Sequence, residues 1–163
     1  MSDVKLVKIN NAMFIANIAP MVQEFVKRID LPNVSYEGMV YVLQTRAQYG
    51  GNASEVWIAH EDEGYLGWAS WHVCEAPLVA TVYMDYIYSK SNRRDVALLF
   101  AKQFMQFADE RNAIWLTMDI VKSGKLLEHF KNMAKDLGLE MSINPWFPCL
   151  ATKVDFYKEK LKE

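Results

Sequence analysis

The sequence contains few cysteines, no marked excess of charge of either sign and no glycine in its most distinctive loop. Its two cysteines, Cys74 and Cys149, lie far apart and lack the spacing of metal ligands. They are expected to be ordinary buried thiols in a reduced chain, with a disulfide between them as the alternative. The formal net charge of −2 at pH 7 excludes a global basic field that would indicate binding to nucleic acid or to an anionic membrane.

Long apolar segments are also missing. The opening stretch, MSDVKLVKINN, does not resemble a signal peptide, and no segment approaches the roughly 20 apolar residues that cross a bilayer. We therefore expect a cytoplasmic protein without membrane contact. The 163 residues, of which 52% are hydrophobic and 23% charged, predict one globular domain over residues 1–163 with a sizeable core.

The periodicity of apolar residues predicts the order of secondary structure. Helical spacing over 15–29 contains Pro20, which either kinks that helix or marks its true start. A second helix is expected over 36–49, ending at Gly50-Gly51. Strands are predicted over 4–9, 56–59, 65–71, 79–88, 114–121, 139–143 and 150–156, and further helices over 95–111 and 126–137. This order, β-α-α-β-β-β-α-β-α-β-β, predicts an α/β fold in which a mixed sheet of about seven strands carries helices on both faces.

The stretch YSKSNRRDVALLFAKQF, residues 88 to 104, joins an aromatic strand to an amphipathic helix through a polar loop with two arginines. A helix start often holds a phosphate, because its first N–H groups are unpaired and lie at the positive end of the helix dipole. Loops that cradle phosphates normally use glycine, and none occurs between Gly67 and Gly124. The loop therefore has the position of an anion site without the usual composition.

Four segments, together with the order of elements, resemble the GCN5-related N-acetyltransferases, the GNAT superfamily, over nearly the whole chain. They are VWIAHEDEGYLGWASW, DYIYSKSNRRDVALLFAKQF, AIWLTMDI and MAKDLGLE. The resemblance implies acyl transfer, usually of acetyl, from coenzyme A to an amine that the sequence does not identify. It also implies that the fourth and fifth strands splay apart and that the pantetheine arm lies between them, paired with the backbone of Ile87, Tyr88 and Ser89.

The family binds the cofactor's pyrophosphate with a motif of the form R/Q-x-x-G-x-G/A. When Val96 and Phe100 take the inward apolar positions, the motif falls on Asn92-Arg93-Arg94-Asp95-Val96-Ala97. Ala97 fits, whereas Asn92 replaces Arg or Gln and Asp95 replaces the middle glycine.

Asp95 introduces a local conflict. Asn92 is the expected N-cap of the helix, and Asp95 could act like the acid of a capping box, so that the helix start satisfies its own donors. Its carboxylate also brings a like charge toward the phosphates, which costs roughly 1–4 kcal/mol at ~4 Å. Arg93 and Arg94 could offset this charge if they face the groove, or could be solvated surface residues.

The resemblance further implies a tyrosine acid on the last helix and a carboxylate base near the fourth strand. The tyrosine position falls on Phe130 or Ala134, neither of which donates a proton, and the neighbouring His129 is expected at the surface. Asp85 is the candidate base, because a carboxylate in an aromatic strand can accept a proton. Alternatively, Asp85 accepts hydrogen bonds from tyrosines or arginines. His72 and Glu75 are candidates of second rank.

Two classes of function therefore remain. One is an acyl-CoA-dependent N-acyltransferase with acetyl-CoA or coenzyme A as cofactor and a small-molecule or protein amine as acceptor. The other is a catalytically silent domain of this fold that binds a protein partner or a second copy, similar to the acetyltransferase-like proteins of some bacteriophages, which include virion-associated and host-interacting proteins. A silent domain would fill the space between the fourth and fifth strands with its own side chains.

Overall fold

The computed structural model describes residues 4–29, 34–62, 64–73, 81–119, 140–143 and 148–162. These residues form one seven-stranded sheet in the order β1-β2-β3-β4-β5-β7-β6. The strands are β1 (Lys5–Lys8), β2 (Ser54–Glu61), β3 (Gly64–Val73), β4 (Thr81–Ser89), β5 (Trp115–Asp119), β6 (Glu140–Ile143) and β7 (Pro148–Lys153). β4 and β5 are parallel, whereas the other neighbouring strands are antiparallel.

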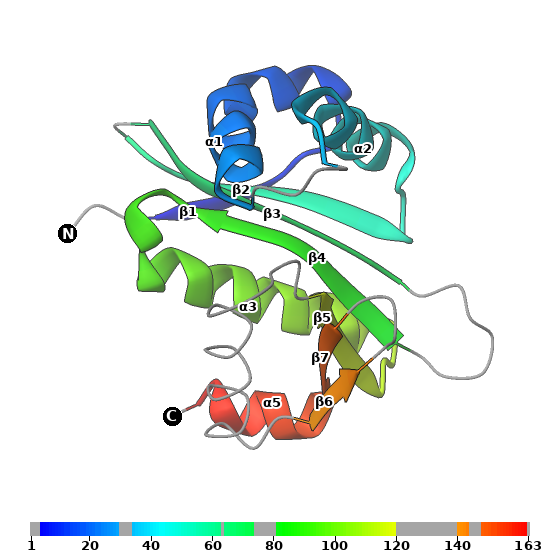
Figure 1. The fold of residues 1–163 in the computed structure, drawn as a ribbon. Helices are drawn as coiled ribbons and strands as arrows, with labels where there is room; N and C mark the ends of the chain where they lie inside the picture. Colours follow the sequence, from blue (N-terminus) through cyan, green and yellow to red (C-terminus); the bar gives the residue numbers. More distant parts are fainter. Residues whose placement is uncertain are drawn as a thin grey trace.

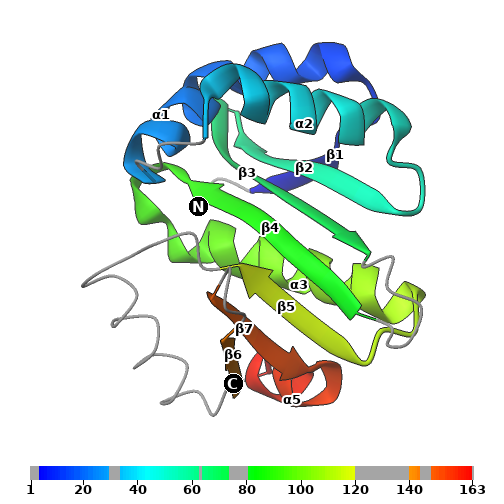
Figure 2. The same ribbon diagram turned by 45° about the vertical axis from the view of Figure 1, so that its right-hand side comes forward.

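Helices cover both faces of this sheet (Figure 1). The helices α1 (Ala19–Ile29) and α2 (Tyr36–Tyr49) lie on one face, and α3 (Arg94–Glu110) and α5 (Val154–Lys160) lie on the other (Figures 1 and 2). The predicted α/β class is confirmed. The predicted order is confirmed only in part, because the helix expected over 126–137 lies outside the described residues.

The N-terminal helices begin where the sequence indicated. Pro20 is the second residue of α1 and follows the 3₁₀ helix η1 (Ala12–Ile18), so it marks the start of the α-helix rather than a kink. The bounds of α2 agree with the prediction: Ser35 caps its start by accepting a hydrogen bond from the N–H of Gly38 at 3.0 Å. Gly51 then turns the chain toward β2 with a φ of 52°.

The strand predicted over 150–156 is wrong in its last part, since β7 ends at Lys153 and α5 follows at once. Val154, expected in that strand, is instead the first residue of α5 and is buried in the core beneath α3. Lys158 forms an ion pair with Asp109 of α3. These two contacts across the layer hold α5 on the sheet, and neither is visible in the local sequence pattern.

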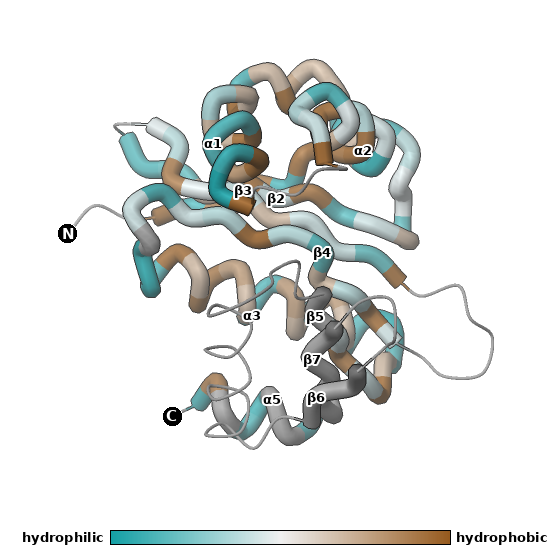
Figure 3. Tube along the Cα trace, in the orientation of Figure 1, coloured by the Kyte–Doolittle hydropathy of each residue, from teal (hydrophilic) through white to brown (hydrophobic). Residues whose placement is uncertain are grey.

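Two apolar clusters pack the two faces. Trp71, Phe100 and Phe107 are fully buried between the sheet and α3, whereas Ile15, Leu43 and Trp68 are fully buried beneath the N-terminal helices. Apolar and polar residues alternate along α1 and α3 (Figure 3), as expected for helices with one buried side. Helices and apolar clusters therefore cover both faces of the sheet. Strand ends and interruptions of strand pairing are the places in the sheet where a ligand could reach the backbone.

Candidate active site

β4 has strand partners on both sides over only part of its length. It pairs with β5 from Thr81 opposite Trp115 to Met84 opposite Met118. Its pairing with β3, in contrast, continues to Ser89. Among the residues that the structure describes, none pairs with β4 on the β5 side beyond Met84, and β4 runs on past the end of β5 (Figure 2).

The interruption coincides with a β-bulge. Ser70 lies opposite Tyr86 and Trp71 lies opposite Met84, so Asp85 is an extra residue in β4. Strand alternation fails at this point: Met84 and Ile87 pack into the cluster beneath α3, while Tyr86 packs into the cluster beneath α1 and α2. Asp85 faces the same side as Tyr86, because it contacts α2. The bulge bends β4 where it leaves β5 and gives Asp85 its direction.

Two side chains from neighbouring elements, an arginine of α2 and a histidine of β3, contact the Asp85 carboxylate. Arg46 of α2 donates from one Nη to Asp85 Oδ2, and the same nitrogen lies 2.8 Å from Ser70 Oγ. His72 Nδ1 lies 2.9 Å from the same carboxylate oxygen, and its ring stacks on Tyr83 with centroids 5.3 Å apart. Asp85 thus accepts hydrogen bonds from an arginine, as the alternative interpretation anticipated, and also contacts a histidine.

After β4, a tight turn leads into α3. The turn is the 3₁₀ segment η2 (Lys90–Asn92), in which Ser91 has a φ of 56°. The N-cap of α3 is Arg93, not Asn92 as predicted, and its side chain makes no capping hydrogen bond. Because Ser91 is left-handed and Arg93 is extended, the N-cap lies one residue later than predicted. The first hydrogen bond of α3 joins the N–H of Ala97 to the carbonyl of Arg93 at 3.2 Å.

Two carboxylates enclose the Arg93 guanidinium. Arg93 donates to Glu61 Oε1 at 2.7 Å and to both oxygens of Asp95, with Nε at 3.1 Å from Oδ1. Hydrogen bonds from Arg93, and then from the backbone N–H groups of Val96 and of Asp95 itself, hold the pKa of the Asp95 carboxyl below its ordinary value. The helix start therefore satisfies part of its own donor capacity with Asp95, as the sequence suggested.

Arg94 differs from Arg93. It is exposed, and within the described ranges no hydrogen bond or ion pair involves it. Of the two arginines expected near the phosphates, one is therefore committed to carboxylates and the other is available.

Three further residues predicted to bind the cofactor, Ile87, Tyr88 and Val96, have side chains that contact other parts of the protein. Ile87 and Val96 pack into the cluster beneath α3. The Tyr88 hydroxyl donates to Glu24 Oε2 at 2.6 Å, and burial together with this carboxylate raises the pKa of Tyr88 to about 12. The side chains of these three residues therefore pack within the protein, and the pairing of the cofactor with the backbone of Ile87, Tyr88 and Ser89 stays a prediction.

Gly67 of β3 supports this stretch from the other side. A Cβ on Gly67 would lie 2.4 Å from the carbonyl oxygen of Tyr88, closer than side-chain atoms approach. The absence of a side chain thus allows β4 to lie tightly against β3 up to Ser89.

Sequence reasoning missed two members of the site, Arg46 and Glu61. Arg46 lies three residues after the buried Leu43 on α2, a spacing that places it on the inner side of that helix. Its partner could not be read, because Asp85 is 39 residues away. Glu75, His129, Phe130 and Ala134 lie outside the described residues, so the expected absence of a tyrosine acid stays a prediction.

Comparison with protein-family models gave no match, and no curated protein matched the sequence. Solved structures did. An acetyltransferase from Streptococcus agalactiae 2603 superposes with a TM-score of 0.68 at 12% identity, covering 92% of this chain and 98% of its own. An acetyltransferase of the GNAT family from Staphylococcus aureus Mu50 gives 0.70 at 5% identity, covering 93% and 99%.

A third structure is the PaiA N-acetyltransferase from Thermoplasma acidophilum in complex with coenzyme A, with a TM-score of 0.65 at 8% identity and coverage of 93% and 99%. Since the neighbours span both chains almost completely, this protein has the fold of the GCN5-related N-acetyltransferases. The resemblance predicted from the order of elements is confirmed at the level of the fold. None of the helices that the structure describes combines the length and apolar character needed to span a membrane, and the cytoplasmic location stays a prediction.

Proposed function

We propose that this protein transfers an acyl group, in the simplest case acetyl, from acyl-coenzyme A to an amine. The observation that carries the proposal is that, among the residues the structure describes, β4–β5 pairing ends at Met84, next to the Asp85 bulge, while β4 continues to Ser89. A strand that keeps one partner and loses the other presents main-chain N–H and C=O groups on its free side. An extended ligand with amide groups, such as pantetheine, can pair with them.

The residues present fit the two ends of coenzyme A unequally. The backbone of Ile87, Tyr88 and Ser89 suits the pantetheine arm. At the helix start, exposed Arg94 and the helix dipole favour the pyrophosphate, whereas the like charge of the exposed Asp95 carboxylate opposes it. When bound, the cofactor would supply a thioester whose carbonyl carbon reacts with a neutral amine. The chain would orient both reactants and accept a proton.

A catalytically silent binding or assembly protein is the second candidate. The observation that favours it is the closed arrangement of Glu61, Arg93 and Asp95, in which two carboxylates neutralise the arginine nearest the expected phosphates. The two candidates differ in one measurable property, because only an acyltransferase requires affinity for coenzyme A.

The contribution of each end of coenzyme A to binding can be measured with fragments of the cofactor. We expect coenzyme A and pantetheine to raise the melting temperature of the wild-type protein. At 1,000 times the dissociation constant the gain is about 4 kcal/mol, or roughly 10 °C for a domain of this size. Adenosine 3′,5′-bisphosphate, which lacks pantetheine, should bind weakly. Differential scanning fluorimetry and titration calorimetry would measure each ligand separately.

Variants at position 95 test the helix start. Asp95→Asn removes the charge, and Asp95→Gly also removes the side chain, so both should tighten coenzyme A and adenosine 3′,5′-bisphosphate while leaving pantetheine unchanged. Asp109→Asn, on the last turn of the same helix, is the matched control and should alter none of them. A melting curve unmoved by coenzyme A in the wild type and in both variants would refute the acyltransferase proposal and favour the silent one.

A further inference from the structure

The cluster of Arg46, His72 and Asp85 contains an imidazole ring bonded to a largely buried carboxylate. We propose that His72 is the general base that deprotonates the acceptor amine, with Asp85 and Arg46 as positioning residues; this inference rests on the proposed acyl transfer. It moves the base from Asp85, where the family resemblance had suggested it, to the histidine beside it.

The hydrogen bond between the ring and the carboxylate defines the tautomer of His72. A carboxylate can only accept hydrogen bonds, so Nδ1, 2.9 Å from Asp85 Oδ2, must carry a proton. In the neutral ring the other nitrogen, Nε2, then holds a lone pair. The His72 side chain is 34% exposed, whereas that of Asp85 is 10% exposed, so the ring reaches solvent and the carboxylate behind it does not. This is the arrangement of a base held by an orienting acid.

Arg46 completes the arrangement by balancing charge. An unpaired aspartate next to the ring would favour the imidazolium form, which cannot accept a proton. Arg46 pairs with the same carboxylate oxygen, so its charge offsets that of the carboxylate beside the ring. Tyr83 stacks on the ring, and Ser70 lies beside Arg46.

The position of the ring also suits the reaction. His72 lies opposite Tyr83 of β4. The next residue of β4, Met84, is the last one that pairs with β5 among the described residues. Stacking on Tyr83 and the bond to Asp85 fix the ring plane, which is what a proton acceptor requires to meet its substrate in one geometry. The sheet therefore holds the ring next to the beginning of the free stretch of β4.

The proposed step balances as follows. His72 Nε2 takes one proton from R–NH₃⁺, and the lone pair left on nitrogen forms the N–C bond at the thioester carbonyl carbon. The C–S bond breaks, its electron pair departs with sulfur as a thiolate, and the second amine proton neutralises this thiolate. The imidazolium then returns its proton to solvent, which leaves an amide, a thiol and the original ring.

The tautomer can be tested without turnover. Nitrogen-15 spectra of the imidazole rings distinguish protonated from unprotonated nitrogens, and the chain has only three histidines, so His72→Gln assigns the signal. We expect His72 to hold its proton on Nδ1 in the wild type. In Asp85→Asn, whose amide can donate to Nδ1, the proton should move in part to Nε2. A wild-type ring protonated on Nε2 would overturn the proposal.

Kinetics separate this inference from the proposed function. Thiol release from acetyl-CoA would be followed with a panel of primary amines: spermidine, a lysine peptide and a peptide with N-terminal alanine. We expect His72→Gln to lower kcat by about 100-fold with the KM for acetyl-CoA within about twofold. His60→Gln on β2 is the control and should retain wild-type kinetics. In Arg46→Met, which leaves the Asp85 carboxylate without its cation, kcat should fall while the KM for acetyl-CoA stays within about twofold, and Arg46→Lys should restore kcat in part.

The outcomes are distinct. Acetyl transfer that survives His72→Gln with an unchanged pH profile overturns the role of His72 and leaves the acyltransferase proposal standing. A wild-type protein that binds no coenzyme A and acetylates none of the amines overturns both.

Discussion

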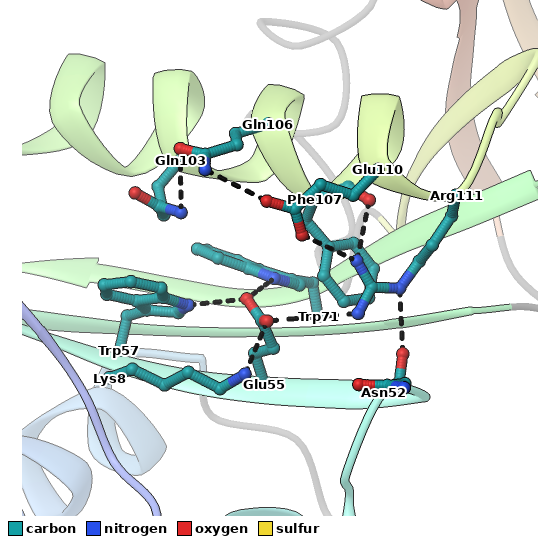
Figure 4. A network of polar contacts seen from close by, with 10 residues as sticks. All are labelled: Lys8, Asn52, Glu55, Trp57, Trp71, Gln103, Gln106, Phe107, Glu110 and Arg111. Carbon is teal, nitrogen blue, oxygen red and sulfur yellow. Dashed lines mark hydrogen bonds and ion pairs between the residues drawn. The ribbon is translucent and has the colours of Figure 1, made fainter.

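Two carboxylates of the same sheet, Glu55 on β2 and Asp85 on β4, are both largely buried, with side chains 7% and 10% exposed, yet they are held in different ways. Glu55 faces α3, where Lys8 Nζ lies 2.7 Å from one oxygen and the indole nitrogens of Trp57 and Trp71 lie 2.8 and 3.1 Å from the other (Figure 4). Asp85 faces α2, and Arg46 and His72 both contact its Oδ2.

The difference lies in the donors. A lysine and two indoles keep their protons at any physiological pH, so the Glu55 network has a single state. An Nη atom of Arg111 lies 4.0 Å from Glu55 Oε1, and the central carbon of its guanidinium lies 3.5 Å from the ring centroid of Phe107 (Figure 4). Asp85, in contrast, is bonded to a histidine whose second nitrogen is unprotonated in the neutral ring. A carboxylate surrounded by fixed donors stabilises a fold, and one bonded to a partly exposed histidine ring can serve a reaction.

The largest expected effect is on stability. Glu55→Ala should lower the free energy of unfolding by about 3 kcal/mol, because two indole N–H groups, one of them fully buried, lose their acceptor and Lys8 loses its partner. Asp85→Ala should cost about 1 kcal/mol, since Arg46 keeps its contact with Ser70. Urea denaturation would measure both.

Glu110→Ala is the control for this comparison. Glu110 belongs to the same network as Glu55 but is 54% exposed, so its truncation should change the free energy of unfolding by less than about 0.5 kcal/mol. Equal costs for Glu55→Ala and Asp85→Ala would show that the Asp85 cluster is as structural as the Glu55 network.

This contrast could not be read from the sequence. Periodicity predicted α2 to the residue and the approximate bounds of β2 to β5, because those patterns depend on neighbours within a few positions. The Asp85 bulge depends on how β3 and β4 are aligned, and alternation gives no sign of it. A strand read with regular alternation would have placed Asp85 and Tyr86 on opposite faces.

The candidate site was predictable in outline for the same reason. The turn after β4 and the conflict at Asp95 follow from local sequence, and the free stretch of β4 was implied by resemblance. Asp85 pairs with Arg46, which is 39 residues away in the sequence, and Arg93 pairs with Glu61, which is 32 residues away. Their contacts depend on packing between layers, which a single sequence does not specify.

A smaller effect concerns acid stability. Burial would raise the pKa of Glu55, but hydrogen bonds from Lys8, Trp57 and Trp71 outweigh it, so the folded pKa lies below the ordinary value of 4.5. The unfolded chain then binds more protons, and the contribution of Glu55 is present above about pH 5 and lost as pH falls through the folded pKa. Relative to the wild type, Glu55→Gln should therefore lose less stability between pH 6 and pH 3 in denaturation measured at each pH. Parallel curves for the two proteins would contradict this assignment, and Glu110→Gln provides the control.

The smallest expected effect is the stability of His72→Gln. Glutamine can still donate to Asp85, and the lost stacking on Tyr83 involves a ring already about one-third exposed, so the free energy of unfolding should change by less than about 0.5 kcal/mol. The same substitution is expected to lower acetyl transfer about 100-fold. A residue that matters for rate and hardly for stability is the reverse of Glu55, whose removal should weaken the fold. If His72→Gln instead destabilised the protein as much as Glu55→Ala, the ring would be a structural donor and the distinction between the two carboxylates would disappear.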